Sequence, residues 1–138
     1  MADDDEETLP ETFWAVAHQL RHLRKETLAP WDIAPSQARA LGVLMRGGPM
    51  RLNELSEHLR IAARSTTEVV DALQDRGLVE RRPDPADRRA TLVAPTGEGT
   101  RVGEAIRASR DAEAEAYFNI LSPEERVSLA GILRKLRR

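Results

Sequence analysis

The chain has 138 residues, of which 41% are hydrophobic and 32% charged, and it contains no cysteine. This length suits one domain and is too short for two independent cores. The lack of cysteine excludes disulfides, thiolate metal sites and thiol redox sensing. No apolar run reaches membrane-spanning length, and the acidic start does not form a signal peptide. We therefore expect a cytoplasmic protein with no membrane partner.

The formal net charge of −2 is unevenly distributed. Residues 1–11 hold six of the 23 acids and no base, which leaves 17 acids against 21 bases and a net charge of +4 for the rest. Residues 51–101 nevertheless hold nine bases and nine acids. A nucleic-acid function must therefore depend on where the charges lie. Residues 1–10 are expected to form an acidic disordered head, because they offer little apolar surface to bury.

The first predicted helix spans about residues 11–29, where apolar residues recur with the helical period. Its apolar face comprises Phe13, Val16, Ala17, Leu20, Leu23, Thr27 and Leu28. A short second helix is expected within "PSQARALGVLMRGGP", with Ser36 as its cap. Leu41, Leu44 and Met45 form its apolar face, and residues 47–49 (Gly-Gly-Pro) end it.

Two further short helices follow, separated by a three-residue break at residues 60–62. The segment "RLNELSEHL" places Leu52, Leu55 and Leu59 at the spacing i, i+3, i+7 of one helix face. A fourth helix is predicted over about residues 63–76. Its inner face comprises Thr66, Val69, Val70 and Leu73. Gly77 is the expected left-handed residue that ends it.

Two strands and two helices complete the predicted order. The strands, at residues 78–82 and 90–94, flank a Pro-Asp-Pro turn, and the prolines must lie at its tip or edge because they cannot donate to a ladder. Thr96 caps a long helix that extends to about residue 119. Its apolar side chains are small and sparse. Ser122 opens a capping box, and the last helix carries Leu129, Ile132, Leu133 and Leu136. The predicted fold class is mainly α with a small β-hairpin wing.

This order predicts a winged helix-turn-helix with N- and C-terminal dimerisation helices. One domain, residues 11–138, would contain a head at about 36–95 and dimerisation helices at about 11–29 and 96–138. The second helix of such a pair enters the major groove of DNA. On the face opposite the core, the fourth helix carries Arg64, Ser65, Thr67 and Glu68 as candidate DNA contacts. For this helix alone, a solvated polar face is an equal alternative.

The hairpin favours DNA binding more strongly. Four arginines, Arg81, Arg82, Arg88 and Arg89, flank its turn. Arg88 and Arg89 at the tip can reach the minor groove, where the negative potential is strongest if the groove is narrow. The Asp87 carboxylate beside them can hold a guanidinium in one orientation. The alternative is a charged tip that protects an edge strand from aggregation.

The stretch "GLVERRPDPADRRATLV", followed by "TGEG", closely resembles the wing signature of the MarR family, the multiple-antibiotic-resistance type of bacterial regulators. "LNELSEHL" and "TTEVVDALQDRG" resemble its two helix-turn-helix elements, and the similarity extends over about residues 10–138. The resemblance implies a homodimeric DNA-binding protein, usually a repressor, often released by a small-molecule ligand. It places Asp87 and Arg89 on the family's paired wing aspartate and minor-groove arginine.

Two positions depart from the family's pattern. Pro95 stands where leucine is common, which stiffens the exit of the wing and removes one backbone donor. Glu68 stands where the recognition helix often carries arginine. A carboxylate at this position either accepts a hydrogen bond from cytosine N4 or holds Arg64 one turn earlier.

The apolar side chains between residues 102 and 120 are small and sparse, and a helix of this kind usually packs against other helices. Together with the first and last helices it predicts a two-fold interface, which would match a pseudo-palindromic operator in double-stranded DNA. A helical cap on a monomer is the alternative.

The resemblance places a small-molecule effector where the first, second and fifth helices meet the head. Candidate lining residues are Phe13, Trp14, His18, Trp31 and Arg39, although a tryptophan on a helix face more often belongs to the core. His18 and His22 are too few ligands for a metal site, and no cofactor is expected.

Motifs for catalysis are missing from the sequence. It has no glycine-rich phosphate loop, serine elbow or metal-binding cluster, so we do not expect an enzyme. The expected function is a sequence-specific DNA-binding transcriptional regulator. The alternative is a winged-helix module that binds protein and not DNA.

Overall fold

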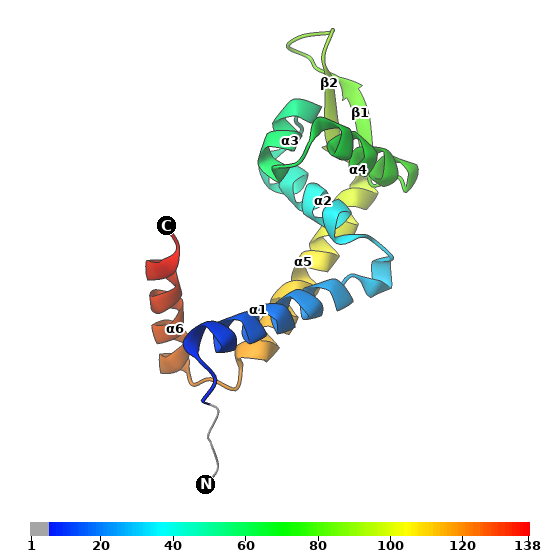
Figure 1. The fold of residues 1–138 in the computed structure, drawn as a ribbon. Coiled ribbons are helices and arrows are strands. Elements are labelled where there is room, and N and C mark those ends of the chain that lie inside the picture. Colours follow the sequence, from blue (N-terminus) through cyan, green and yellow to red (C-terminus); the bar gives the residue numbers. More distant parts are fainter. Residues whose placement is uncertain (1–5) are drawn as a thin grey trace.

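The computed structural model describes residues 6–138 and confirms a mainly helical chain with one β-hairpin (Figure 1). The elements in chain order are α1 (Leu9–Glu26), η1 (Ala29–Trp31), α2 (Pro35–Gly47), α3 (Leu52–Leu59), α4 (Ala63–Asp75), β1 (Val79–Pro83), β2 (Thr91–Pro95), α5 (Gly97–Phe118) and α6 (Pro123–Leu136). The short 3₁₀ helix η1 was not expected from the sequence. Each predicted α-helix and strand is present within about two residues of its expected bounds, except that α1 ends at Glu26.

Helix α1 begins earlier than expected. Thr8 caps it, because its hydroxyl accepts a hydrogen bond from the Glu11 amide at 3.4 Å and the Glu11 carboxylate accepts one from the Thr8 amide at 2.8 Å. This reciprocal pair satisfies two amides that the helix leaves unpaired. Leu9 and Pro10, which were expected to belong to the acidic head, are therefore helical. The first part of that head, residues 1–5, lies outside the described residues.

The predicted cap of α2 is wrong by two positions. Pro35 occupies the first helical position, which its fixed φ angle favours, so Ala34 and not Ser36 precedes the helix. The Gln37 side-chain oxygen accepts a hydrogen bond from the Ala34 amide at 3.3 Å. A glutamine that reaches back over one turn thus replaces the expected serine hydroxyl.

Side-chain hydrogen bonds lock the helix pair α3 and α4. Arg60 turns the chain between them in the left-handed conformation, with φ of 55°. The Ser56 hydroxyl donates to the Thr66 hydroxyl at 2.8 Å across the pair, and Thr66 is fully buried. Arg39 Nη1 on α2 donates to the Leu59 carbonyl at the end of α3, at 2.7 Å. These bonds therefore hold α3 against α4 and hold both helices against α2.

The hairpin pairs β1 and β2 antiparallel, with Val79 opposite Pro95 and Pro83 opposite Thr91. Both strands start one residue later than predicted. Pro83 ends the ladder, which confirms its expected place. Val93 and Met50 exchange backbone hydrogen bonds of 2.8 and 3.1 Å, which join the hairpin to the segment before α3. Backbone bonds at the middle of the ladder thus attach the wing to the segment before α3.

The start of α5 requires a glycine. Thr96 caps this helix as predicted, and its hydroxyl accepts a hydrogen bond from the Gly99 amide at 3.0 Å. A Cβ atom at Gly99 would lie 1.8 Å from the Leu78 carbonyl oxygen, which is far inside van der Waals contact. The close approach fixes the position of α5 beneath the hairpin. Gly77, with φ of 71°, ends the preceding turn as predicted.

The hydrophobic core lies in the winged-helix head, which we define as residues 35–95, and in the adjoining half of α5. Leu41, Leu44, Leu55, Leu73 and Val93 are fully buried there. Neither α1 nor α6 has a buried residue over its whole length. Figure 1 shows α1 crossing α5, and α6 standing at the far end of α5 from the head. Within residues 6–138, no helix combines the length and the apolar character needed to cross a membrane.

Candidate nucleic-acid interface

Helix α4 separates a buried face from an exposed polar face. Thr66, Val70 and Leu73 are buried against the core. Arg64, Ser65, Thr67 and Glu68, the residues predicted to contact DNA, are all exposed at its N-terminal half. The Thr67 hydroxyl donates to the Ala63 carbonyl at 3.0 Å, which leaves its oxygen free to accept. This half of α4 thus offers a positive group, a carboxylate and two hydroxyls.

Arg64 and Glu68 lie within ion-pairing range on this exposed face. The distance between Arg64 Nε and Glu68 Oε1 is 3.8 Å, and the side chains are 93% and 72% exposed. A pair so open to solvent is weak. The contact agrees with the hypothesis that Glu68 orients Arg64, but it also leaves both side chains free to contact a ligand.

The four arginines of the hairpin have different roles. Arg81 Nη2 pairs with Asp71 on α4 at 2.6 Å, and Arg81 also contacts Gln74. Arg82 approaches Glu80 on the same strand at 3.9 Å. Among the described residues, the guanidinium groups of Arg88 and Arg89 have no hydrogen-bond or ion-pair partner. Of the four, Arg88 and Arg89 are therefore free to contact a ligand at the tip, whereas Arg81 joins the wing to α4.

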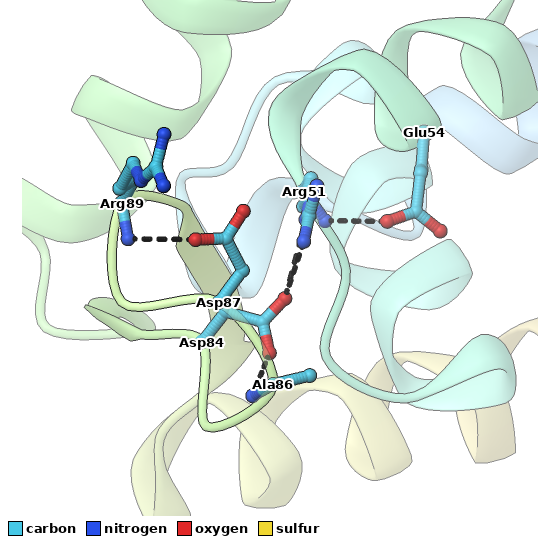
Figure 2. A network of polar contacts seen from close by, with 6 residues as sticks. All are labelled: Arg51, Glu54, Asp84, Ala86, Asp87 and Arg89. Atoms are coloured by element: carbon cyan, nitrogen blue, oxygen red, sulfur yellow. Dashed lines mark hydrogen bonds and ion pairs between the residues drawn. The ribbon is translucent and has the colours of Figure 1, made fainter.

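The role predicted for Asp87 differs in the structure. Its Oδ1 atom accepts a hydrogen bond from the backbone amide of Arg89 at 3.1 Å, as Figure 2 shows. Within residues 6–138 it forms no ion pair with the Arg89 guanidinium. An Asp carboxylate commonly bonds an amide two residues on, because its short side chain reaches that far in a turn. Asp87 therefore shapes the loop that carries Arg89 and leaves its guanidinium free.

An ion pair that the sequence analysis missed lies at the base of the tip. Arg51, the residue before α3, donates from Nε and Nη2 to Oδ2 of Asp84 at 3.2 and 2.9 Å (Figure 2). The hydrogen bond from the Ala86 amide and then that from Arg51 hold the pKa of Asp84 below its ordinary value. Asp84 in turn raises the pKa of Arg51. The two residues are 33 positions apart, and no local pattern connects them.

The ion pairs of the head determine which of its arginines remain free to contact a ligand. Asp84 neutralises Arg51, and Asp71 neutralises Arg81, both within the head. Arg88 and Arg89, which have no ion pair among the described residues, lie at the tip of the wing, and the weakly paired Arg64 lies at the start of α4. The placement of charge, and not its sum, thus makes this face suitable for a polyanion.

A cavity of about 770 Å³ lies between α1, α2 and α5. Its lining includes Leu20, Leu41, Met45, Ile106, Arg110 and Phe118. The position agrees with the effector site that the resemblance implies, but the predicted lining residues lie elsewhere. Trp14 is 65% exposed and packs edge-on against Phe13, Arg39 bonds to Leu59, and His18 is exposed. Trp31 is partly buried against the core.

A winged helix-turn-helix with exposed polar groups on its second helix and free arginines at the wing tip defines a class of nucleic-acid-binding regulators. The MarR family model matches residues 31–90. The multiple antibiotic resistance protein MarR of Salmonella typhimurium is 31% identical over 111 residues, which cover 79% of this chain and 76% of that protein. The chain therefore belongs to the MarR family, and it is a DNA-binding transcriptional regulator.

Two further comparisons agree with this assignment. An uncharacterized HTH-type transcriptional regulator of Bacillus subtilis, YsmB, is 31% identical over 121 residues, covering 88% of this chain and 83% of that protein. The solved structure of a MarR family protein from Bacillus stearothermophilus is 29% identical, with a TM-score of 0.83, and covers 94% of this chain and 90% of that one. The similarity includes the hairpin and the terminal helices as well as the matched head.

Proposed function

We propose that the chain acts as a homodimeric repressor that binds a pseudo-palindromic operator in double-stranded DNA. Helix α4 enters the major groove with Arg64, Ser65, Thr67 and Glu68, and the wing places Arg88 and Arg89 at the minor groove. The observation that carries this proposal is the contrast within the wing. Arg81 is committed to α4, whereas the two tip arginines have no partner in the described chain.

The terminal helices support the dimer. Large apolar side chains on α1, on α6 and between α5 and α6 are exposed, among them Leu9, Phe13, Trp14, Ile120, Val127, Ile132 and Leu136. Apolar surface gathered in this way on a protein marks a binding face. A second copy of the same helices is the simplest cover, because a two-fold interface uses one face twice. Two heads related by this axis would meet two half-sites about one helical turn apart.

The cavity supports a small-molecule effector. It lies between α1 and α5, which belong to the proposed dimerisation region, and α2, which belongs to the head. A ligand that binds there more tightly in one arrangement of these helices than in another would change the spacing of the two heads. Release from the operator follows if the favoured arrangement no longer fits two half-sites. Regulation of this kind requires no catalysis.

A gel-shift assay with a selected oligonucleotide pool tests the proposal and identifies the operator. Arg89→Ala should weaken operator binding by roughly 1–3 kcal/mol per half-site and lower the salt slope by about two units, because the homodimer loses one arginine contact in each half-site. Arg101→Gln is the matched control, because it removes one arginine from an exposed ion pair on α5. Equal binding by the wild type and Arg89→Ala at several salt concentrations contradicts the wing contact. Failure of the wild type to bind DNA at all would favour a protein-binding module.

A further inference from the structure

We propose that Arg51 is a positioning residue for DNA binding: by holding Asp84, it fixes the wing tip that presents Arg89, and it does not itself need to contact DNA. This inference rests on the proposed function, because it assigns a structural cause to the orientation of Arg89. It concerns a residue that lies outside both α4 and the wing in the sequence. The contact joins the start of α3 to the far end of the hairpin (Figure 2).

The geometry of the pair is that of a fixed contact. Two adjacent nitrogens of Arg51 donate to one oxygen of Asp84, so the guanidinium plane is oriented as well as attracted. The Asp84 side chain is only 12% exposed and that of Arg51 is 40% exposed. A shielded pair is screened by salt much less than an exposed one. By contrast, Glu98 and Arg101 pair within a single helix turn at the surface and join no two elements.

Asp84 organises the turn that carries Arg89. Its Oδ1 atom accepts a hydrogen bond from the Ala86 amide at 2.9 Å. Its backbone amide donates to the Ala90 carbonyl at 3.0 Å, and its carbonyl accepts from the Asp87 amide at 3.2 Å. Asp87 then accepts from the Arg89 amide. Consecutive hydrogen bonds through Asp84 and Asp87 thus connect Arg51 to Arg89.

The other end of the path is anchored in the core. Arg51 is the cap residue of α3, and its amide donates to Glu54 at 3.2 Å. Its carbonyl accepts from the amide of Leu55, whose side chain is fully buried. The strand ladder stops at Pro83, so the tip lies beyond the support of the hairpin itself. Arg51 therefore supplies the only ion pair within the described chain that joins this tip to the helices.

Asp84→Asn gives the sharpest test, measured as operator affinity beside Arg51→Gln. If charge alone matters, loss of the Asp84 carboxylate should strengthen binding, because it removes repulsion from phosphate. If Asp84 positions the wing tip, its loss should weaken binding. We expect both variants to weaken operator binding about tenfold, the size of ordinary coupling within one polar network. The controls Glu98→Gln and Arg101→Gln make the same charge changes and should leave affinity within about twofold, as for surface positions.

A double-mutant cycle with Arg89→Ala identifies the route. If Arg51 acts through Arg89, then Arg51→Gln should weaken binding by no more than about twofold in the Arg89→Ala background. Additive losses would show that Arg51 acts by a route other than Arg89 and would overturn the inference. Unchanged or tighter binding by Asp84→Asn would also overturn it. If Arg89→Ala weakens binding while Asp84→Asn does not, the proposed function stands and only this inference fails.

Hydrogen exchange of the free protein provides a readout that does not depend on affinity. The amides of residue 84 and of residues 86–90 should exchange faster in Arg51→Gln and in Asp84→Asn, while the amides of α4 keep their wild-type rates. Asp84→Asn is nearly isosteric and keeps an oxygen for the Ala86 amide, so it serves if Arg51→Gln unfolds. Unchanged exchange at residues 84–90 in Asp84→Asn would overturn the inference.

Discussion

The winged-helix head and the terminal helices α1 and α6 bury very different amounts of apolar surface within one chain. The buried hydrophobic residues described in the structure extend from Leu28 to Ile106 and lie mainly in the head. The large exposed ones lie in residues 9–16 and 120–136. The head thus completes its own core, whereas α1 and α6 leave their apolar faces open. In the proposed dimer, a second copy of the chain covers these faces.

The local sequence pattern does not reveal this difference. Leu52, Leu55 and Leu59 on α3 have helical spacing, and so do Leu129, Ile132 and Leu136 on α6. Leu55 is fully buried and Ile132 is 56% exposed. Periodicity indicates that a face will be covered, but it does not say by which chain. Substitutions on the two helices therefore test whether α3 belongs to the core of one subunit and α6 to the interface between two subunits.

The largest effect is expected in the head. Leu55→Ala should lower the free energy of unfolding by about 2–5 kcal/mol, because it leaves a cavity in a core that cannot collapse around it. Denaturant unfolding measures the loss, which should be the same at low and high protein concentration. The dimer dissociation constant of folded Leu55→Ala should match that of the wild type. A loss below about 1 kcal/mol would show that the head is more loosely packed than its burial indicates.

A smaller effect of a different kind is expected on α6. Ile132→Ala should raise the dimer dissociation constant by roughly tenfold or more, because each buried methylene contributes about 0.8 kcal/mol and symmetry applies the change twice. Sedimentation equilibrium measures this constant, and the wild type should give twice the chain mass of 15.4 kDa. A monomeric wild type, or an unchanged constant in Ile132→Ala, would break the comparison. Hydrogen exchange in the head should not change.

The fold was largely predictable because its signals are local. Thr96, Ser122 and Gly77 mark element ends by chemistry that acts within one turn, and the structure confirms all three. Ser36 failed because Pro35 fixed the first helical position and moved the cap to Ala34. The 3₁₀ helix η1 was not predicted. Besides its own turn bonds, its Trp31 carbonyl accepts a hydrogen bond of 2.5 Å from Arg76, 45 residues away, which no local pattern indicates.

The candidate site was less predictable, since its important contacts join distant segments. Position on α4 and at the tip was sufficient to predict that Arg64 and Arg89 would be exposed. It was not sufficient to predict that Arg81 binds α4 or that Arg51 binds Asp84, because the register of the wing against the helices decides both. The residues that line the cavity were not predicted for the same reason. The path of α1 across α5 places Leu20 and not Trp14 against the cavity.

Lowering the pH should remove a larger contribution to stability from Asp84 in the head than from Glu11 on α1. The folded-state pKa of Asp84 is lowered, chiefly by the Ala86 amide and by Arg51, and that of Glu11 is lowered by Thr8. A lowered pKa adds stability that is present above the unfolded pKa, about 4, and lost as pH falls through the folded value. The advantage of the wild type over Asp84→Asn should therefore shrink as the pH falls below about 4 and disappear only below the lowered folded-state pKa of Asp84.

Thermal unfolding of both variants between neutral and acidic pH measures this difference. Glu11→Gln should show the same direction with a smaller amplitude, because its capping box is exposed at the start of α1, whereas the Asp84 carboxylate is shielded. Equal stability of the wild type and Asp84→Asn at neutral pH would mean that the Arg51 contact adds nothing to the folded head.

The smallest effect is expected at the exposed pair on α4. Unlike the apolar faces of α1 and α6, this polar face needs no second chain to cover it, so its pairing should matter little without DNA. Glu68→Gln should change the free energy of unfolding by no more than about 0.5 kcal/mol, the upper range for a surface i, i+4 pair. On the operator, the pair should matter more, because DNA removes water from both side chains.

A double-mutant cycle on one operator and its single-base variants decides between the two roles of Glu68. If Glu68 holds Arg64, as their 3.8 Å contact favours, then Arg64→Ala and Glu68→Gln should be non-additive and relax preference at the same base pair. If Glu68 instead accepts from cytosine N4, Glu68→Gln should relax a second base pair by about 1–3 kcal/mol. Affinity for random DNA should then stay level or rise, because a carboxylate repels phosphate. Additive losses at two different base pairs would rule out the orienting role and assign Glu68 a base of its own.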